Sequence, residues 1–158
     1  MNELNRLNIY AKENDFQGQA IYGVAGIFSL IEKNIADYLR QYELSPAKFN
    51  ALMVIKHHST KNGISQVEIG ERLLVTASNM TRLVDKLCSD GLIERSAQEG
   101  DRRVNLIKIT AKGSDLLDRV WPDYYSLISR ITGILSNNEL EQLSGILSKW
   151  FDNLESFN

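Results

Sequence analysis

Residues 63–112, GISQVEIGERLLVTASNMTRLVDKLCSDGLIERSAQEGDRRVNLIKITAK, decide the fold of this chain. The stretch holds two short helix patterns separated by a tight turn. Two runs rich in isoleucine, leucine and valine follow, and the charged segment 99–103, EGDRR, separates them. We therefore expect a helix pair followed by a β-hairpin.

The first helix of the pair is predicted to begin at Ser65. Ser65 and Glu68 form the pattern of a capping box, in which the hydroxyl and the carboxylate each satisfy a backbone N–H that the first turn leaves free. After a turn at Leu74, Thr76 is the expected N-cap of the second helix. The apolar groups of the first helix and the turn are expected to come from Val67, Ile69, Leu73 and Leu74.

The second helix carries an apolar stripe that fixes which way it faces. The stripe recurs at i, i+3, i+4 and i+7 and consists of Met80, Leu83, Val84 and Leu87. The opposite face consists of Ser78, Arg82, Asp85 and Ser89, flanked by Asn79, Thr81 and Lys86. A guanidinium such as that of Arg82 can contact guanine or a phosphate, whereas the ammonium of Lys86 suits a phosphate. This face is typical of a helix that reads the major groove of DNA, and the alternative is an ordinary amphipathic helix with a solvated outer face.

A β-hairpin is predicted after this helix. Gly91 ends the helix at a position that favours left-handed backbone, and strands are expected over 92–98 and 104–110. The loop between them carries Arg102 and Arg103, which can enter a minor groove, and Asp101, which can pair with one of them. The alternative is a solvated charged turn. Together with the helix pair, the hairpin forms a winged helix-turn-helix.

Longer helix patterns precede this stretch. A helix is predicted over residues 16–42, where a broad apolar face is made of Ile21, Val24, Ala25, Phe28, Ile31, Ile35 and Leu39. Ser45 followed by Pro46 marks the start of a second helix, which is expected to run to about His58. Ile64 is expected to add a short third strand.

Two further helices are predicted after the hairpin. Thr110 is the expected N-cap of the first, and Pro122 predicts a kink or a break inside it. Ser136 and Glu139 form a second capping box before the final helix, whose stripe is Leu140, Leu143, Ile146, Leu147, Trp150, Phe151 and Leu154. The terminal helices and the distal part of the N-terminal one carry more apolar surface than a small lobe can cover, which predicts that a partner chain buries it.

Charge is unevenly distributed along the chain. The 158 residues have a net charge of -2 and are 43% hydrophobic, which fits one folded domain. Residues 72–112 nevertheless hold eight basic and five acidic side chains, so the excess of acid lies elsewhere. A basic lobe on an acidic body is typical of a nucleic-acid reader. No apolar run approaches the roughly 20 residues that span a bilayer, and no signal peptide is evident, so a cytoplasmic protein without membrane contact is expected.

The sequence gives little support for catalysis or metal binding. It has no glycine-rich phosphate loop and no constellation of nucleophile, base and orienting group, so we expect no enzyme and no cofactor. His57 and His58 are adjacent and would point about 100° apart on a helix, and Cys88 is the one cysteine, so no metal site is expected. Cys88 is interpreted as an inert, half-buried thiol.

The order of several segments resembles the multiple-antibiotic-resistance regulator (MarR) family. The segments are 44–52 (LSPAKFNAL), 69–74 (IGERLL), 78–87 (SNMTRLVDKL), 91–95 (GLIER), 101–103 (DRR) and 109–113 (ITAKG). The resemblance covers nearly the whole chain, and its specificity comes from the order and spacing of the segments rather than from any one of them.

This resemblance implies a homodimer that binds a pseudo-palindromic operator in double-stranded DNA. One recognition helix per chain would enter a major groove, and the wings would reach the flanking minor grooves. By position, Arg103 matches the family's minor-groove arginine, Asp101 its partner and Arg102 a backbone contact. The family also implies release of DNA by a small aromatic or phenolic effector. Tyr22, Phe28, His57, Trp121 and Tyr125 could line its pocket but are equally explained as core or interface, so the effector site stays open.

These inferences predict a mainly helical chain with a small β-hairpin wing, an α+β arrangement. One domain, 1–158, would hold a DNA-binding lobe at 44–112 and a helical dimerisation region at 1–43 and 113–158. The expected function is sequence-specific transcription regulation by a dimeric repressor, and the alternative is a winged-helix protein-interaction module without DNA readout. The candidate DNA-binding residues are Ser78, Asn79, Thr81, Arg82, Lys86, Arg102 and Arg103, with Asp101 stabilising the wing.

Overall fold

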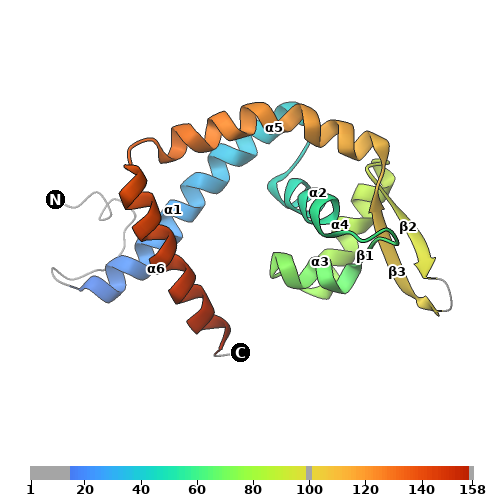
Figure 1. The fold of residues 1–158 in the computed structure, drawn as a ribbon, viewed down its shortest axis with the longest axis horizontal. Coiled ribbons are helices and arrows are strands. Elements are labelled where there is room, and N and C mark those ends of the chain that lie inside the picture. The colour runs from blue at the N-terminus through green and yellow to red at the C-terminus, as the bar shows by residue number, and fades with distance from the viewer. Residues whose placement is uncertain (1–14, 99–100, 157–158) are drawn as a thin grey trace. The chain divides into compact units, whose positions relative to one another are not determined.

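The computed structural model describes residues 15–98 and 101–156, and the side chains of residues 97–98 and 101–105 lie outside this description. In chain order the elements are α1 (Phe16–Leu39), η2 (Arg40–Tyr42), α2 (Pro46–His58), β1 (Ile64–Ser65), α3 (Gln66–Leu73), α4 (Ala77–Ser89), β2 (Ile93–Gln98), β3 (Asp101–Ile109), α5 (Ala111–Thr132) and α6 (Asn137–Glu155) (Figure 1). The described chain is mostly helical with one small antiparallel sheet. The predicted fold class is confirmed.

Side-chain caps set the helix starts, as the sequence predicts. Before α3, the Ser65 hydroxyl accepts from the backbone N–H of Glu68 at 3.2 Å, and the Glu68 carboxylate accepts from the N–H of Ser65 at 3.1 Å. The second capping box, at Ser136, is also formed before α6. Thr110 caps α5 by accepting from the N–H of Gly113 at 3.1 Å. Each cap satisfies a donor that the first helical turn leaves free, so the boundaries follow from local chemistry.

The three strands are ordered β1, β3, β2 in the sheet. β1 is the short third strand expected at Ile64, which lies opposite Ile107 of β3. At the base of the hairpin, Ile93 of β2 lies opposite Ile109. Apolar residues therefore pair where the hairpin joins the helices.

The outer part of the hairpin differs from the prediction. β3 begins at Asp101 rather than at Val104, so the backbone of residues 101–103 belongs to the strand and not to the loop. The reason is that pairing resumes after an irregularity at Ala97 and places Gln98 opposite Asp101. A bulge of this kind lets a ladder continue past a mismatch in length.

The apolar core of the winged-helix lobe is buried within the chain. Its fully buried side chains include Leu52, Ile55, Ile69, Val84, Leu87 and Ile107, each with no exposed surface. Ile69 is thus confirmed as a core residue, but Val67 is 69% exposed and Leu74 is 68% exposed, against expectation. The helical stripe of α3 that faces the core passes through Ile69, Gly70 and Leu73, which leaves Val67 on another face. Leu74 follows the last helical residue in left-handed backbone, with φ 53°, and its side chain stays exposed.

The chain divides into two compact units, residues 1–121 and 122–158. α5 is helical from Ala111 to Thr132 without interruption, so the break expected at Pro122 is absent, although the boundary between the units falls at this proline. The expected kink stays a prediction. The predicted domain limits, a lobe at 44–112 within a single domain, also stay a prediction. No helix in the described part of the chain is both long and apolar enough to cross a bilayer.

Apolar side chains remain exposed on the terminal helices. α6 has no buried residue, and α1 buries only Gly23 and Leu39. The large apolar side chains exposed on these two helices are Phe16, Ile21, Tyr22, Val24, Ile27, Phe28, Leu30, Leu143, Ile146, Leu147, Phe151 and Leu154. Exposed apolar surface of this extent on a single helix is typical of an interface.

Candidate nucleic-acid interface

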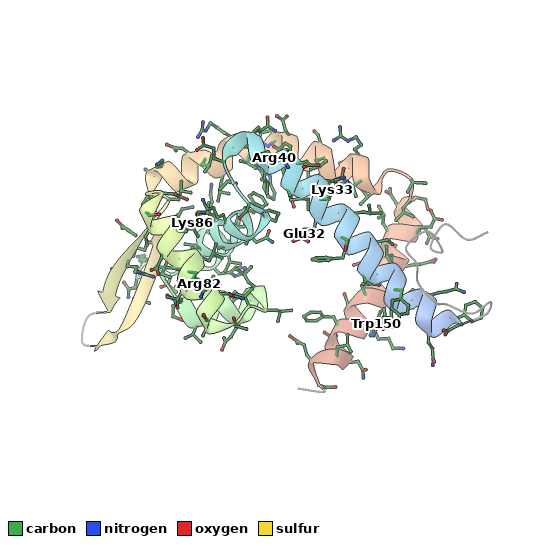
Figure 2. The ribbon with its side chains drawn as sticks, turned by 180° about the vertical axis from the view of Figure 1, so that it is seen from behind. Glu32, Lys33, Arg40, Arg82, Lys86 and Trp150 are labelled. Carbon is green, nitrogen blue, oxygen red and sulfur yellow. The ribbon has the colours of Figure 1, made fainter. Side chains whose placement is uncertain are left out.

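Burial fixes the rotation of α4 about its axis. Met80, Val84 and Leu87 are buried, as their spacing predicts, so the opposite side of the helix must face solvent. The candidate DNA-binding residues on that side are all exposed: Ser78, Asn79, Thr81, Arg82 and Lys86. Arg82 and Lys86 both project from α4 (Figure 2). We refer to these five residues as the exposed face of α4.

The turn between α3 and α4 positions this face. Leu74 adopts left-handed backbone with φ 53°, and the N–H of Val75 donates to the carbonyl of Gly70 at 3.1 Å, which closes the end of α3. Thr76 then caps α4 by accepting from the N–H of Asn79. The direction of α4 relative to α3 therefore depends on backbone hydrogen bonds and one hydroxyl.

Thr81 makes hydrogen bonds within the protein. Its hydroxyl donates to the carbonyl of Ala77 at 3.0 Å and accepts from the side-chain amide of Gln66 at 2.8 Å. Gln66 is the first residue of α3 and was not among the residues that the sequence singled out. No sequence signal links two side chains 15 positions apart on different helices.

The exposed face of α4 is cationic because its neighbouring acid is neutralised. Asp85 forms an ion pair with Arg95 of β2, with Nη2 and Oδ1 2.6 Å apart. Among the described carboxylates, none pairs with Arg82 or Lys86. Two positive charges are therefore available to an anionic partner, and the Asp85–Arg95 pair joins α4 to the base of the wing.

The capping carboxylate at the start of α3 is held in its ionised form. Hydrogen bonds from the Ser65 hydroxyl and then from the Ser65 backbone N–H lower the pKa of Glu68 below its ordinary value, with a smaller contribution from the charge of Arg72. Burial raises the pKa of the Tyr124 hydroxyl in α5.

The wing residues can be placed only by their backbone. Asp101, Arg102 and Arg103 lie at the start of β3, and their side chains are outside the described part of the chain. The contacts predicted for these three side chains are therefore predictions still.

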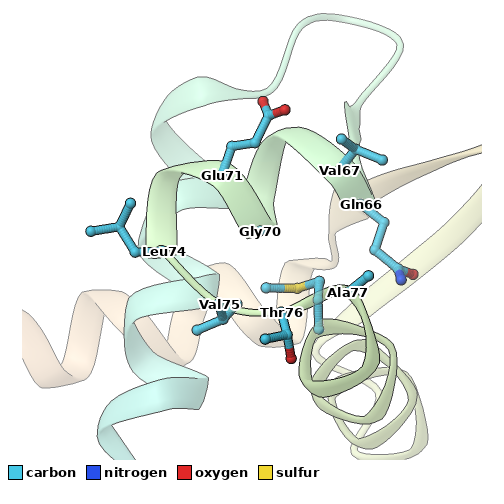
Figure 3. A pocket seen from close by; sticks show the side chains of 9 residues that line it. Gln66, Val67, Gly70, Glu71, Leu74, Val75, Thr76 and Ala77 are labelled. Carbon is cyan, nitrogen blue, oxygen red and sulfur yellow. The ribbon is translucent and has the colours of Figure 1, made fainter. Parts of the chain in front are cut away.

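Besides a hollow of about 350 Å³ beside Lys48 and Asp90, two more border the lobe in the described part of the chain. One of about 560 Å³ lies over the α3–α4 turn and is lined by Gln66, Val67, Gly70, Glu71, Leu74, Val75, Thr76, Ala77 and Met80 (Figure 3). The other, of about 260 Å³, lies between α2 and the first half of α5 and is lined by Met53, Lys56, His57, Leu117, Asp118 and Trp121. Lys56 and Asp118 form an ion pair of 2.6 Å there. Within the described residues, no three His, Cys, Asp or Glu side chains are grouped as they would be around a metal ion.

Comparison with known sequences gives one family. The family model described as "MarR family" matches residues 42–104. The chain is 30% identical to the HTH-type transcriptional regulator MhqR of Bacillus subtilis over 128 residues, which cover 81% of this chain and 86% of the relative. It is 28% identical to the transcriptional repressor MprA of Escherichia coli, over 80% of this chain and 72% of the relative.

Comparison with solved structures agrees. A cysteine-to-serine variant of MarR from Escherichia coli, crystallised with operator DNA, superposes with a TM-score of 0.74 at 25% identity and covers 80% of this chain and 89% of the other. The Staphylococcus aureus MepR–DNA complex superposes with a TM-score of 0.77, covering 84% of this chain and 96% of the other. At 21% identity the second likeness concerns the fold alone.

Proposed function

The chain belongs to the MarR family, and we propose that it is a homodimeric repressor that binds a pseudo-palindromic DNA site and is released by a small organic effector. A regulator of this kind acts where its DNA is, so a cytoplasmic location is part of the proposal. The relatives named above include a repressor and a protein crystallised on operator DNA, and this supports the proposal.

The exposed face of α4 carries the proposal. Its polar side chains lie opposite the buried Met80, Val84 and Leu87, so the helix can enter a groove without uncovering the core. Asn79 and Arg82 supply groups that can pair with base edges, and Lys86 supplies a phosphate contact. We further propose that Arg103 enters the minor groove, that Arg102 contacts the backbone, and that Asp101 stabilises the wing. Ser78 and Thr81 complete the proposed contact set.

The exposed apolar surface of α1 and α6 supports a second copy of this chain as the dimer partner. A helix with no buried residue gains little from folding on its own, because most helical stability in proteins comes from packing an apolar face. A two-fold axis would present two copies of α4 to a two-fold related site.

The hollow between α2 and α5 is the proposed effector site. Its volume of about 260 Å³ suits one aromatic ring with a small substituent, and Trp121 and Met53 supply apolar walls. The imidazole of His57 can hydrogen-bond a phenol, and Lys56, which is paired with Asp118, lies beside it. Because α2 also belongs to the lobe, a molecule between it and α5 can alter the position from which α4 reaches DNA.

Selection of bound sequences from a random duplex pool tests the function. The purified protein should enrich a two-fold related motif, and the selected duplex should lose affinity steeply between two salt concentrations, because phosphate contacts release counterions. Small phenols and aromatic acids are then screened for release of the labelled duplex, with Trp121→Ala as the variant expected to lose the response.

The outcomes separate the two candidate functions. A two-fold motif bound by two chains supports the regulator. No enriched motif, with weak binding of all duplexes, would contradict it and favour a winged-helix module that contacts another protein. If no compound in the screen released the duplex, the effector would be removed from the proposal. If a compound released the wild-type protein and Trp121→Ala equally well, the hollow between α2 and α5 would be removed as its site.

A further inference from the structure

Gln66 lies against the recognition helix although it belongs to α3. The capping box formed by Ser65 and Glu68 fixes the first turn of α3, so the position from which the Gln66 side chain starts is fixed as well. Its carboxamide nitrogen donates to the hydroxyl of Thr81 at 2.8 Å. Figure 3 shows the Gln66 side chain extending from α3 toward the start of α4, beside Ala77.

The hydrogen bonds of Thr81 determine which way the Gln66 amide faces. A hydroxyl has one proton, and Thr81 gives it to the carbonyl of Ala77 at 3.0 Å. The oxygen of Thr81 can therefore only accept from Gln66, so the amide nitrogen must face Thr81. The carbonyl oxygen of the amide, Oε1, faces away from this contact.

The carboxamide keeps hydrogen-bonding capacity after this contact. Gln66 is half-buried, and no hydrogen bond to its Oε1 is made within the described part of the chain. Oε1 and the second N–H of the amide remain available. An ordered acceptor beside an ordered donor matches adenine, which offers the N6 amine and the N7 acceptor in the major groove. A phosphate offers acceptors alone and would leave Oε1 unpaired.

We propose that Gln66 is a specificity-determining residue that reads an adenine, and that Thr81 positions it by anchoring its amide nitrogen. This inference rests on the proposed binding of DNA through α4 and adds a residue from the neighbouring helix to the reading surface. The Thr81 anchor lowers the conformational freedom that Gln66 would otherwise lose on binding.

Two pairs of variants test the proposal by anisotropy titration of full-length protein. The probes are the selected duplex and a set in which each base pair is replaced in turn. Gln66→Met keeps the length of the side chain and removes both hydrogen-bonding groups. It should lose a preference for adenine at one base pair per half-site, about 5- to 140-fold, from the usual discrimination of a bidentate contact. Thr81→Val should weaken the same preference by a smaller factor, and Thr81→Ser, which keeps the hydroxyl, should retain it.

Gln41→Met is the matched control, because it makes the same change at an exposed residue in η2, outside the helix-turn-helix. Thermal melting should show all variants folded, since Gln66 and Thr81 both lie outside the core. An equal loss on every duplex in Gln66→Met would make Gln66 a phosphate contact and overturn the proposal. Loss of the preference in Thr81→Val but not in Gln66→Met would make Thr81 the reader, and an unchanged Thr81→Val would remove the anchor. If the wild-type protein prefers no base pair at all, the proposed function itself fails, which is a distinct result.

Discussion

The winged-helix lobe and the terminal helices differ in how far their apolar side chains are buried within the chain. In the lobe, Leu52, Ile69 and Val84 are buried by residues of the same chain, whereas α6 buries none of its residues. Both regions begin their helices with the same kind of capping box, so the difference does not lie in local helix signals. We infer that the difference lies in the origin of the surface that covers the apolar side chains of each region. The lobe is expected to fold on its own contacts, and the terminal helices are expected to depend on a second chain.

Removing volume from the lobe core should give the largest effect. Leu52→Ala empties a fully buried position and should lower the free energy of unfolding by about 2–5 kcal/mol, which urea denaturation would measure. The matched change at the exposed Asn50 of the same helix, Asn50→Ala, should have little effect. Equal midpoints for the two variants would mean that the lobe core is not the source of stability.

Placing a charge on the apolar stripe of α6 should separate the chains. Ile146 is 62% exposed in the single chain, and Ile146→Asp removes a side chain whose full burial is worth about 1.5–3 kcal/mol. Each of the two copies loses this contribution, so sedimentation should show the dimer dissociating at a concentration more than tenfold higher than for the wild type. Ser148→Asp places the same charge on the opposite side of α6 and serves as the control. An unchanged dissociation constant of the dimer in Ile146→Asp would exclude this stripe from the interface.

A change on the exposed face of α4 should alter DNA binding and leave both stability and assembly intact. Arg82→Ala should reduce discrimination at one base pair by about 1–3 kcal/mol in anisotropy titrations against single-site variants of the selected duplex. Arg40→Ala is a suitable control, because Arg40 is exposed and pairs with Asp37 outside the lobe. A uniform loss on all duplexes would make Arg82 a phosphate contact, and no loss would remove it from the interface.

The two capping boxes should show the smallest effect and the sharpest contrast between the regions. Ser65→Ala should cost about 0.5–2 kcal/mol of stability. Because hydrogen bonds from Ser65 lower the pKa of Glu68 in the folded chain, the stabilisation by Glu68 is present above its unfolded pKa and is lost as the pH falls through the lower folded value. Urea midpoints from neutral to acidic pH should therefore fall less in Ser65→Ala than in the wild type.

Ser136→Ala makes the same change in α6, where Ser136 lowers the pKa of Glu139 in the same way. Its effect should appear in the concentration dependence of dimer melting rather than in the lobe. If both serine variants changed the melting curve in the same way at all protein concentrations, the separation between the two regions would be contradicted.

Much of the fold could be predicted because its signals are local. The caps at Ser65, Thr110 and Ser136 and the buried stripe of α4 depend on residues three or four positions apart. The burial of individual residues in and after α3 was harder to predict from the sequence, because Val67 and Leu74 are as apolar as Ile69 yet remain exposed. Their exposure depends on how α3 is rotated against the core, and eight residues give a weak periodic signal.

The sequence predicted which face of α4 is exposed, but it did not predict the contacts that this face makes with other elements. The sequence indicated that Arg82 and Asp85 share a polar face, but it could not show that Arg95 neutralises Asp85 from a strand ten residues further on. The Gln66–Thr81 hydrogen bond was missed for the same reason. Contacts between elements depend on the packing of the whole lobe, whereas a helical face follows from spacing alone.

We propose that the terminal helices hold two lobes so that both copies of α4 reach one DNA site. Sedimentation of the protein with a selected duplex and with a duplex cut to one half-site tests it most directly. We expect two chains on the full site and a much weaker complex on the half-site, because the second lobe then has no base pairs to read. Equal affinity for the two duplexes, with one chain on each, would contradict it.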